Sequence, residues 1–496
     1  MLYFLGFIML IIGGVMVVPA IASVFLNETF LIPYFLVPAA VALIIGIFLR
    51  RFFKKTELSL GKAMVLVTAA WLLFALFSTV PFVLGTQKLR DGTPNQTPMS
   101  PIDGYFESMS GFTATGLTMI PTTPDNLADP ASSFHIETTP STILFWRSLT
   151  EWVGGMGIIV LFLTALIGMG KAARKMYVAE ARIESIEPSI RETAKSLWKI
   201  YVLLTLIGVI GLYFAGSTLF EAINHSMTGI ATGGFSVRNA SFSGYSVPIL
   251  LITIGIMMAG ATSFALHKKI WGGKWRELFR NVEVQLMLVL IVLGTIAIGF
   301  TIGVTHGLFQ SVSALSGTGF STINLQTAAI GDFPKLMLTV LMIVGGGYGS
   351  TSSAIKLIRC LIILKAAHWT IKKSFLPERA IVPMKLGGRI YEEHEMREVS
   401  TYAMIYVFVL IGGALALMLI GAQAGQPQYT GVNCMFESAS AQGNVGLSVG
   451  ITQAAMPVAG KVVLTVQMLV GRLEIIPVIA FLNFLFLKSI RRLPGV

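Results

Sequence analysis

Residues 107–118 read ESMSGFTATGLT, and the same pattern recurs three more times along the chain. The other copies are HSMTGIATGGFS at 225–236, QSVSALSGTGFS at 310–321 and ESASAQGNVGLS at 437–448. Each copy has serine at its second position, a hydroxyl residue at its fourth, glycine at its tenth and a hydroxyl residue at its twelfth. One copy would be weak evidence, but four copies in a fixed register predict an internally repeated fold. We call these copies the four phrases.

The composition is that of a membrane protein. Of the 496 residues, 54% are hydrophobic and 12% are charged, whereas about a quarter of the residues in soluble domains are charged. Apolar runs long enough to cross a bilayer as helices recur along the whole chain. We expect ten such spans, near residues 3–26, 31–50, 62–86, 141–170, 197–215, 246–267, 281–304, 334–364, 400–421 and 457–487. The first run is expected to be a retained helix rather than a signal peptide, because no Lys or Arg precedes Arg50.

The basic residues predict how the chain is oriented. Most of the 36 Lys and Arg residues fall in or beside the segments 50–62, 171–199, 268–280, 356–397 and 488–496. Cytoplasmic loops carry such an excess, so we expect these segments and both termini on the cytoplasmic side. The net charge of +12 then reflects topology, and no nucleic-acid partner is expected.

The four phrases are expected to lie in loops that enter and leave the membrane on its outer side. The segments before their glycines, 102–113, 218–231, 306–316 and 430–441, are too short to span a bilayer. They suit re-entrant half-helices followed by extended backbone. Such backbone is tolerated at membrane depth only where it is buried in protein or lines a watery cavity. Four copies around one axis would meet this condition.

The phrases contain the chemistry of a cation filter. Glycine permits backbone dihedrals that turn carbonyl oxygens towards an axis, and rings of carbonyls can replace the hydration shell of a cation. The half-helices would direct the partial negative charge of their C-terminal ends towards the ion. The alternative is that small and hydroxyl residues mark ordinary turns and helix contacts, which explains a single phrase better than four in register.

Five stretches of the chain are distinctive beside the repeat itself: FWRSL (145–149), WVGGMG (152–157), ATGGFS (231–236), the stretch 345–356 and GRLE (471–474). In these stretches the chain resembles the TrkH family of bacterial potassium-uptake subunits, within the Trk/Ktr/HKT superfamily. The resemblance implies an all-α membrane protein with four parallel helix–pore-loop–helix repeats around one central pore. The implied division is an N-terminal helix pair at 1–55 and repeats at 56–175, 176–275, 276–375 and 376–496.

The resemblance also implies which residues bind the ion. The selectivity glycines of the family match Gly116, Gly234, Gly319 and Gly446, and glycine rather than serine at the first of these favours potassium over sodium. Potassium would be bound by backbone carbonyls of Thr113, Ala114, Thr115, Gly116, Ala231, Thr232, Gly233, Gly234, Ser316, Gly317, Thr318, Gly319, Gly443, Asn444, Val445 and Gly446. Because the fourth loop reads GNV where the first reads TAT, the loops need not contribute equally.

Two further features concern gating. The run GGGYGSTSS at 345–353 should break the span 334–364, with a tightly packed helix crossing as the alternative. Arg472 lies well inside the last span, where an arginine is a functional candidate, with a salt bridge to another helix as the alternative. The resemblance implies an intramembrane gating loop and a pore arginine that opposes cation flow. The implied gating residues are Gly345, Gly346, Gly347, Gly349, Lys356 and Arg472.

Two acidic residues open phrases, whereas the other two phrases open with His225 and Gln310. Glu107 and Glu437 could concentrate cations at the outer mouth or anchor the half-helices. The second role is slightly favoured, and both hypotheses stay open at this point.

The function expected is potassium uptake through a pore in the bacterial inner membrane. A symporter coupled to protons or sodium is the alternative, although such carriers typically have inverted repeats and these repeats are parallel. The chain contains no HExxH, GxSxG or phosphate-cradling motif in a suitable context, so neither an enzyme nor a cofactor is expected. The resemblance implies a homodimer in membrane lipid and a cytosolic TrkA-type nucleotide-binding ring, with 171–199 and 366–398 as docking candidates.

Overall fold

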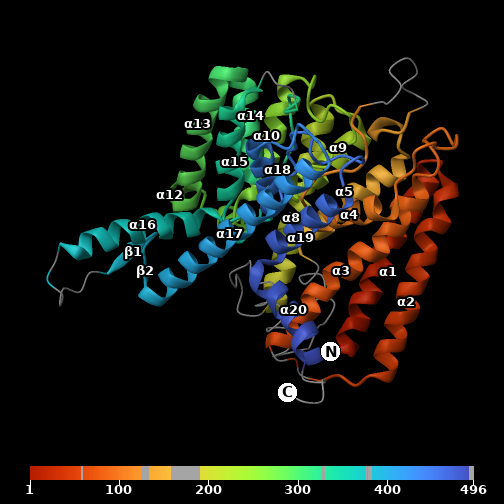
Figure 1. The fold of residues 1–496 in the computed structure, drawn as a ribbon, viewed down its shortest axis with the longest axis horizontal. Coiled ribbons are helices and arrows are strands. Elements are labelled where there is room, and N and C mark those ends of the chain that lie inside the picture. The colour runs from red at the N-terminus through yellow and green to blue at the C-terminus, as the bar shows by residue number, and fades with distance from the viewer. Residues whose placement is uncertain are drawn as a thin grey trace.

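The computed structural model describes residues 1–56, 58, 60–123, 133–157, 190–326, 330–375, 377 and 383–490. The predicted fold class is confirmed: the chain is an all-α membrane protein in which a helix pair precedes four similar units (Figure 1). The pair consists of α1 (Leu2–Phe25) and α2 (Ile32–Phe52), joined by the short 3-10 helix η1 (Thr29–Leu31). These two helices pack side by side at one edge of the molecule.

Each unit contains a long helix, a half-helix and a third helix that we call the closing helix. Unit 1 contains α3 (Leu60–Gly85), α4 (Pro101–Phe112) and α5 (Ser141–Gly155); unit 2 contains α8 (Ile190–Phe214), α9 (Leu219–Ile230) and α10 (Val247–Ala261); unit 3 contains α13 (Val282–Ile302), α14 (Val304–Ser316) and α15 (Asp332–Val344); unit 4 contains α17 (Glu393–Gln423), α18 (Gly431–Gly443) and α19 (Val458–Leu473). The 3-10 helix η3 (Ile136–Thr138) precedes α5. Each closing helix also packs against the half-helix of the next unit, and α19 packs against α4 of unit 1. The four units therefore form a closed ring.

Three of the four half-helices begin at a residue whose side chain caps the helix. Ser100, Thr218 and Thr430 precede α4, α9 and α18, and each side-chain oxygen accepts a hydrogen bond from a backbone N–H in the first turn. At the start of α9, Glu221 completes a capping box with Thr218. These caps fix the starts of the short helices that lead into the glycine loops.

Several predicted spans are confirmed, and two are wrong as continuous helices. Six of the described helical segments are long and apolar enough to cross a membrane: α1, η1 with α2, α3, α8, α13 and α17. The predicted span 246–267 bends by 108° between α10 and α11 (Phe264–Trp271), and the span 457–487 bends by 116° between α19 and α20 (Ile475–Ile490). The backbone leaves the helical region at Thr262, which is extended, and at Glu474, where φ is +62°. Neither Thr262 nor Glu474 is itself a glycine or a proline, and the nearby Gly260, Gly471 and Pro477 are only weak signals for these bends.

The other two predicted spans have different outcomes. The span 334–364 is broken between α15 and α16 (Leu357–Ser374), as the glycine-rich run predicts. We call residues 345–356 the glycine-rich loop. The span 141–170 is helical as α5 up to Gly155, and its part beyond residue 157 lies outside the described residues.

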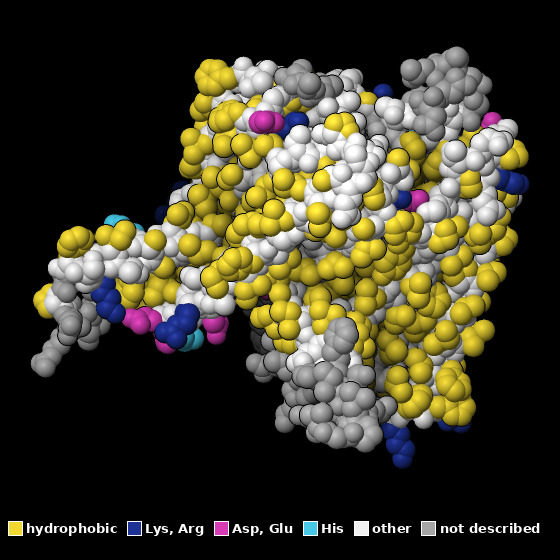
Figure 2. Space-filling view, in the orientation of Figure 1, with side chains coloured by type: hydrophobic (Ala, Val, Ile, Leu, Met, Phe, Trp, Pro, Cys, Tyr) yellow, Lys and Arg dark blue, Asp and Glu magenta, His cyan; other side chains and the backbone are white. Residues whose placement is uncertain are grey.

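An arm projects from the bundle between units 3 and 4 (Figure 1). It contains α16, the antiparallel strands β1 (Met384–Leu386) and β2 (Arg389–Tyr391), and the first turns of α17. A small core of Ile362, Met384, Leu386 and Met396 holds it together. Figure 2 shows hydrophobic side chains covering most of the bundle in view, whereas charged side chains gather along the arm and at the ends of the molecule. A further short helix, α12 (Arg276–Arg280), follows α11.

Candidate functional site

The loops that follow the half-helices share one backbone conformation. In each loop, φ is positive at the glycine and again two residues before it. At the glycines, φ is +85° at Gly116, +84° at Gly234, +84° at Gly319 and +96° at Gly446. Two residues earlier in the same loops, φ is +50° at Ala114, +53° at Thr232, +75° at Gly317 and +52° at Asn444. The fourth loop, whose sequence differs most, therefore has the same backbone as the others. Asparagine tolerates the left-handed region better than most residues with a side chain, which accounts for its presence there.

The four glycines meet in a ring. A Cβ atom added to Gly116 would collide with the carbonyl oxygen of Gly233, in the loop of the next unit. The same holds around the circle, from Gly234 to the Thr318 carbonyl, from Gly319 to the Val445 carbonyl and from Gly446 to the Thr115 carbonyl. Each loop thus contacts the next through a glycine that has no room for a side chain. We call Gly116, Gly234, Gly319 and Gly446 the glycine ring.

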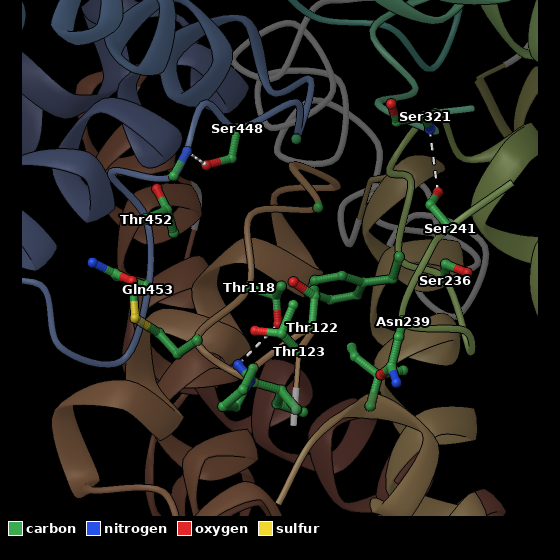
Figure 3. A pocket seen from close by; sticks show the side chains of 18 of the residues that line it. Thr118, Thr122, Thr123, Ser236, Asn239, Ser241, Ser321, Ser448, Thr452 and Gln453 are labelled. Carbon is green, nitrogen blue, oxygen red and sulfur yellow. Dashed lines mark hydrogen bonds between the residues drawn. The ribbon is translucent and has the colours of Figure 1, made fainter. Parts of the chain in front are cut away.

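The ring forms the floor of a cavity. A hollow of about 690 Å³ is lined by all four ring glycines, by hydroxyl, amide and apolar side chains from the loops above them, and by the charged side chains of Asp103, Arg147 and Arg238. Figure 3 shows the last residue of every phrase, which carries a hydroxyl group, at this cavity: Thr118, Ser236, Ser321 and Ser448. Within each loop the ring glycine is partly exposed, whereas the three residues before it are buried. Solvent therefore reaches the loops from the cavity at the glycines.

The first and last residues of each phrase bond to each other, which explains why both recur. Glu107 accepts a bond of 2.9 Å from Thr118, and Glu437 accepts one of 2.8 Å from Ser448. The corresponding pairs are His225 with Ser236 at 3.1 Å and Gln310 with Ser321 at 2.5 Å. Both glutamates are fully buried and also accept backbone N–H bonds, from Met119 and from Val449. This geometry supports the anchoring role and places neither carboxylate at an exposed mouth.

The closing helices repeat a second pattern. The fourteenth residue, counted from the first residue of each helix, is Gly154, Gly260, Gly345 or Gly471. A Cβ on three of these would collide with, or crowd, a carbonyl oxygen near the end of the half-helix in the same unit: Phe112, Ile230 and Gln442. The next residue is Gly155, Ala261 or Gly346 in units 1 to 3 and Arg472 in unit 4. Unit 4 therefore has an arginine at a position where the other three units have glycine or alanine.

Arg472 is 3% exposed and bonds to backbone carbonyls. It donates to the carbonyl of Thr351 at 2.9 Å, to that of Gly155 at 2.7 Å and to that of Gly154. Glu474, two residues on, pairs instead with Arg359 of α16 at 3.0 Å. The arginine thus connects the closing helix of unit 1 to the glycine-rich loop of unit 3.

The glycine-rich loop fills the break between α10 and α11. The Gly347 N–H donates to the Ala261 carbonyl at 2.8 Å, and the Phe264 N–H donates to the Gly349 carbonyl at 3.0 Å. Lys356 ends the loop at a φ of +81°, is buried, and has its Nζ atom 5.8 Å from the centre of the Tyr348 ring. The predicted gating residues therefore lie together, next to the closing helices of units 2 and 4.

Thr351 is the residue of this loop that sequence reasoning missed. Its hydroxyl lies 2.9 Å from the carbonyl of Ile230, at the end of half-helix α9, and 2.8 Å from that of Gly260. It is also 3.3 Å from the hydroxyl of Thr232, one of the predicted ion-binding residues. The run GSTSS marks this region as polar but does not distinguish one hydroxyl from its neighbours.

Fold and site together define the class of protein: a multi-span membrane protein in which four half-helices and their glycine loops converge on one ring beneath a cavity. The sequence profile of the TrkH family, described as a cation transport protein, matches residues 39–301 and 291–486. An uncharacterized cation transporter of Methanocaldococcus jannaschii is 35% identical to this chain, over 99% of this chain and 97% of its own length.

Two further comparisons agree. The Trk system potassium uptake protein TrkH of Salmonella typhimurium is 29% identical over 95% of each chain. The crystal structure of the potassium transporter TrkH from Vibrio parahaemolyticus matches with a TM-score of 0.80, at 26% identity and over 97% of each chain. The chain belongs to the TrkH family of cation transport proteins, and it is a transporter rather than an enzyme.

Proposed function

We propose that the chain takes up potassium through a selective pore in the inner membrane, with its termini on the cytoplasmic side. The ion would be bound by carbonyls of residues 113–116, 231–234, 316–319 and 443–446. The closed glycine ring carries this proposal, because its close contacts allow four backbone segments to face one axis. Carbonyl rings of this kind can replace the water around a dehydrated cation. The names of the relatives, which are potassium uptake proteins, favour potassium as the cation.

Gating is assigned to the glycine-rich loop and Arg472. A positive charge close to the ion path repels cations, and the repulsion is strong where water is excluded. Arg472 is held by carbonyls of two different units, so a movement of the loop would move the charge. Opening would then displace the loop and the arginine together.

Regulation from the cytoplasm is part of the proposal. We assign a homodimer and a TrkA-type nucleotide-binding ring as partners, and docking of the ring to 171–199 and 366–398. The second segment corresponds largely to the arm, which carries exposed charged pairs such as Lys373–Glu393. The first lies outside the described residues up to position 189. A pull-down with variants of each segment tests the assignment, and ring binding that is unchanged by both sets of variants would exclude it.

The filter is tested by reversal potentials of the purified protein in liposomes with opposed potassium and sodium gradients. The wild-type current should reverse near the potassium equilibrium potential. Gly116→Ser and Gly319→Ser should lower the potassium-to-sodium permeability ratio, because each added side chain meets a carbonyl of the next loop. Gly92→Ser is the matched control, because Gly92 has a φ of +87° but no atom within 4 Å of its added Cβ.

The same measurement separates the pore from the coupled carrier. A symporter would give a reversal potential that moves with the proton or sodium gradient at a fixed stoichiometry, whereas a potassium pore follows the potassium gradient. If both ring variants keep wild-type flux and selectivity, the filter is located elsewhere.

A further inference from the structure

The closing helix of unit 1 carries two buried charged residues for which the proposed filter and gate have no use. Arg147 and Glu151 lie one turn apart on α5 and are 1% and 0% exposed. They belong to the motif FWRSLTEW, residues 145–152. Arg147 also lines the cavity above the glycine ring. A buried charge requires an explanation, because removing it from water is costly.

The other closing helices are apolar at the position of Glu151. The eleventh residue of each helix, counted from its first residue, is Glu151 in α5 and Met257, Met342 or Met468 in α10, α15 and α19. All four side chains are fully buried. Methionine accepts hydrogen bonds only weakly, whereas a carboxylate accepts several. Unit 1 therefore has a strong acceptor at a place where the other units have an apolar side chain.

The Glu151 carboxylate lies directly behind the second glycine loop. Its two oxygens are 3.1 Å and 3.3 Å from the backbone nitrogen of Phe235. A Cβ atom added to Gly233 would collide with the same carboxylate. Glu151 thus contacts the residue before and the residue after Gly234, the ring glycine of unit 2.

Arg147 holds the same loop one residue further on. Its Nη1 donates to the Ser236 carbonyl at 3.0 Å, and its guanidinium carbon lies 4.0 Å from the centre of the Phe235 ring. Its Nε donates to Glu107 at 2.7 Å, so the arginine links the first phrase to the second. Two opposite charges on one helix therefore hold residues 233–236, Glu151 from behind the loop and Arg147 at the wall of the cavity.

We infer that Glu151 and Arg147 are positioning residues that hold the second loop and thereby set the preference of the pore for potassium over sodium. This inference rests on the proposed function of the glycine ring. A filter discriminates between cations through the positions of its carbonyls, and the Phe235 N–H and Ser236 carbonyl limit the movement of Gly233 and Gly234. The second loop depends on this polar support at a place where methionine stands in the other units.

The test exchanges Glu151 for the residue of the other units. Purified full-length Glu151→Met is reconstituted in liposomes, and its reversal potential is measured in opposed potassium and sodium gradients. Loss of a hydrogen bond to a charged acceptor corresponds to about a tenfold change in an equilibrium, so we expect the permeability ratio to fall about tenfold. Glu151→Gln keeps a carbonyl acceptor and should retain most of the selectivity. Met342→Leu, at the same position of α15, is the matched control and should leave the ratio unchanged.

The outcomes separate this inference from the proposed function. If the wild type shows no potassium-selective current, the proposed function itself fails. If the wild type is selective and Glu151→Met folds with the wild-type ratio, the positioning role is refuted while the pore stands. If Glu151→Met does not fold, Glu151→Asp decides. Its shorter side chain withdraws the carboxylate from the Phe235 N–H, so a lower ratio supports the role and an unchanged ratio refutes it.

Discussion

Replacing Thr351 by valine should loosen the glycine-rich loop without changing its shape. The hydroxyl of Thr351 shares its proton between the carbonyls of Ile230 and Gly260, at 2.9 Å and 2.8 Å. Valine has nearly the same volume but cannot donate, so these buried carbonyls lose a donor. Such a loss costs about 1–3 kcal/mol. At about 2 kcal/mol, the equilibrium between the resting and displaced loop shifts about 30-fold towards the displaced form.

The shift should appear as faster potassium flux through liposomes that contain the protein without any regulatory subunit. We expect the flux of Thr351→Val to rise by up to about 30-fold, because the bonds from the Thr351 N–H to Gly260 and from Arg472 to the Thr351 carbonyl remain. Thr351→Ser keeps the hydroxyl and should behave like the wild type. Ser350→Ala is a second control, since the Ser350 hydroxyl bonds within the loop, to Gly347. Unchanged or lower flux in folded Thr351→Val would refute the proposal that this loop limits conduction.

Three further changes have expected outcomes. Arg472→Ala removes a buried charge that bonds to three carbonyls and should raise the single-channel conductance in planar bilayers; a conductance at or below the wild-type value would indicate a purely structural arginine. Gly319→Ala should lower the potassium-to-sodium permeability ratio, as Gly319→Ser does, because its Cβ meets a carbonyl, whereas Gly303→Ala, with a similar φ but open space, should keep the wild-type ratio. Glu28→Gln weakens the cap that Glu28 provides at Ser141, where it accepts a backbone N–H bond of 2.7 Å. It should lower the free energy of unfolding by about 1 kcal/mol, seen as a lower melting temperature in detergent with an unchanged reversal potential.

The half-helices and glycine loops could be predicted from the sequence because their signals are local. A segment too short to span, followed by glycine at a fixed offset, specifies a half-helix and a turn in positive φ. The repeat predicted how the loops are arranged, because four equivalent loops around one axis can bury their irregular backbone in protein or line a shared cavity with it. The conformation of the fourth loop was harder to predict, because its sequence GNV differs from the TAT of the first loop. Asn444 nevertheless adopts the same positive φ as Ala114.

The bends in the closing helices could not be predicted in the same way, because they depend on contacts between units. At Glu474 the helix α19 stops where the side chain reaches Arg359 on α16, a residue more than a hundred positions away in the sequence. Pro477 follows in the first turn of α20, where proline is tolerated, and it was a weak signal for a new helix start. The contacts of Thr351 are equally remote, since its partners lie on α9 and α10.

The closing helices show how a nearly fourfold backbone can support an unequal function. Four arginines at the position of Arg472 would place four positive charges close together and close to the proposed ion path, and their mutual repulsion would be strong where water is excluded. A single arginine can instead bond to carbonyls of two neighbouring units, and one movement can shift it. Glu151 is a second departure of this kind. Unit 1 has a buried carboxylate at a position where the other three units have methionine. Repetition therefore sets the geometry of the ring, and single departures from the repeat provide the residues that can control it.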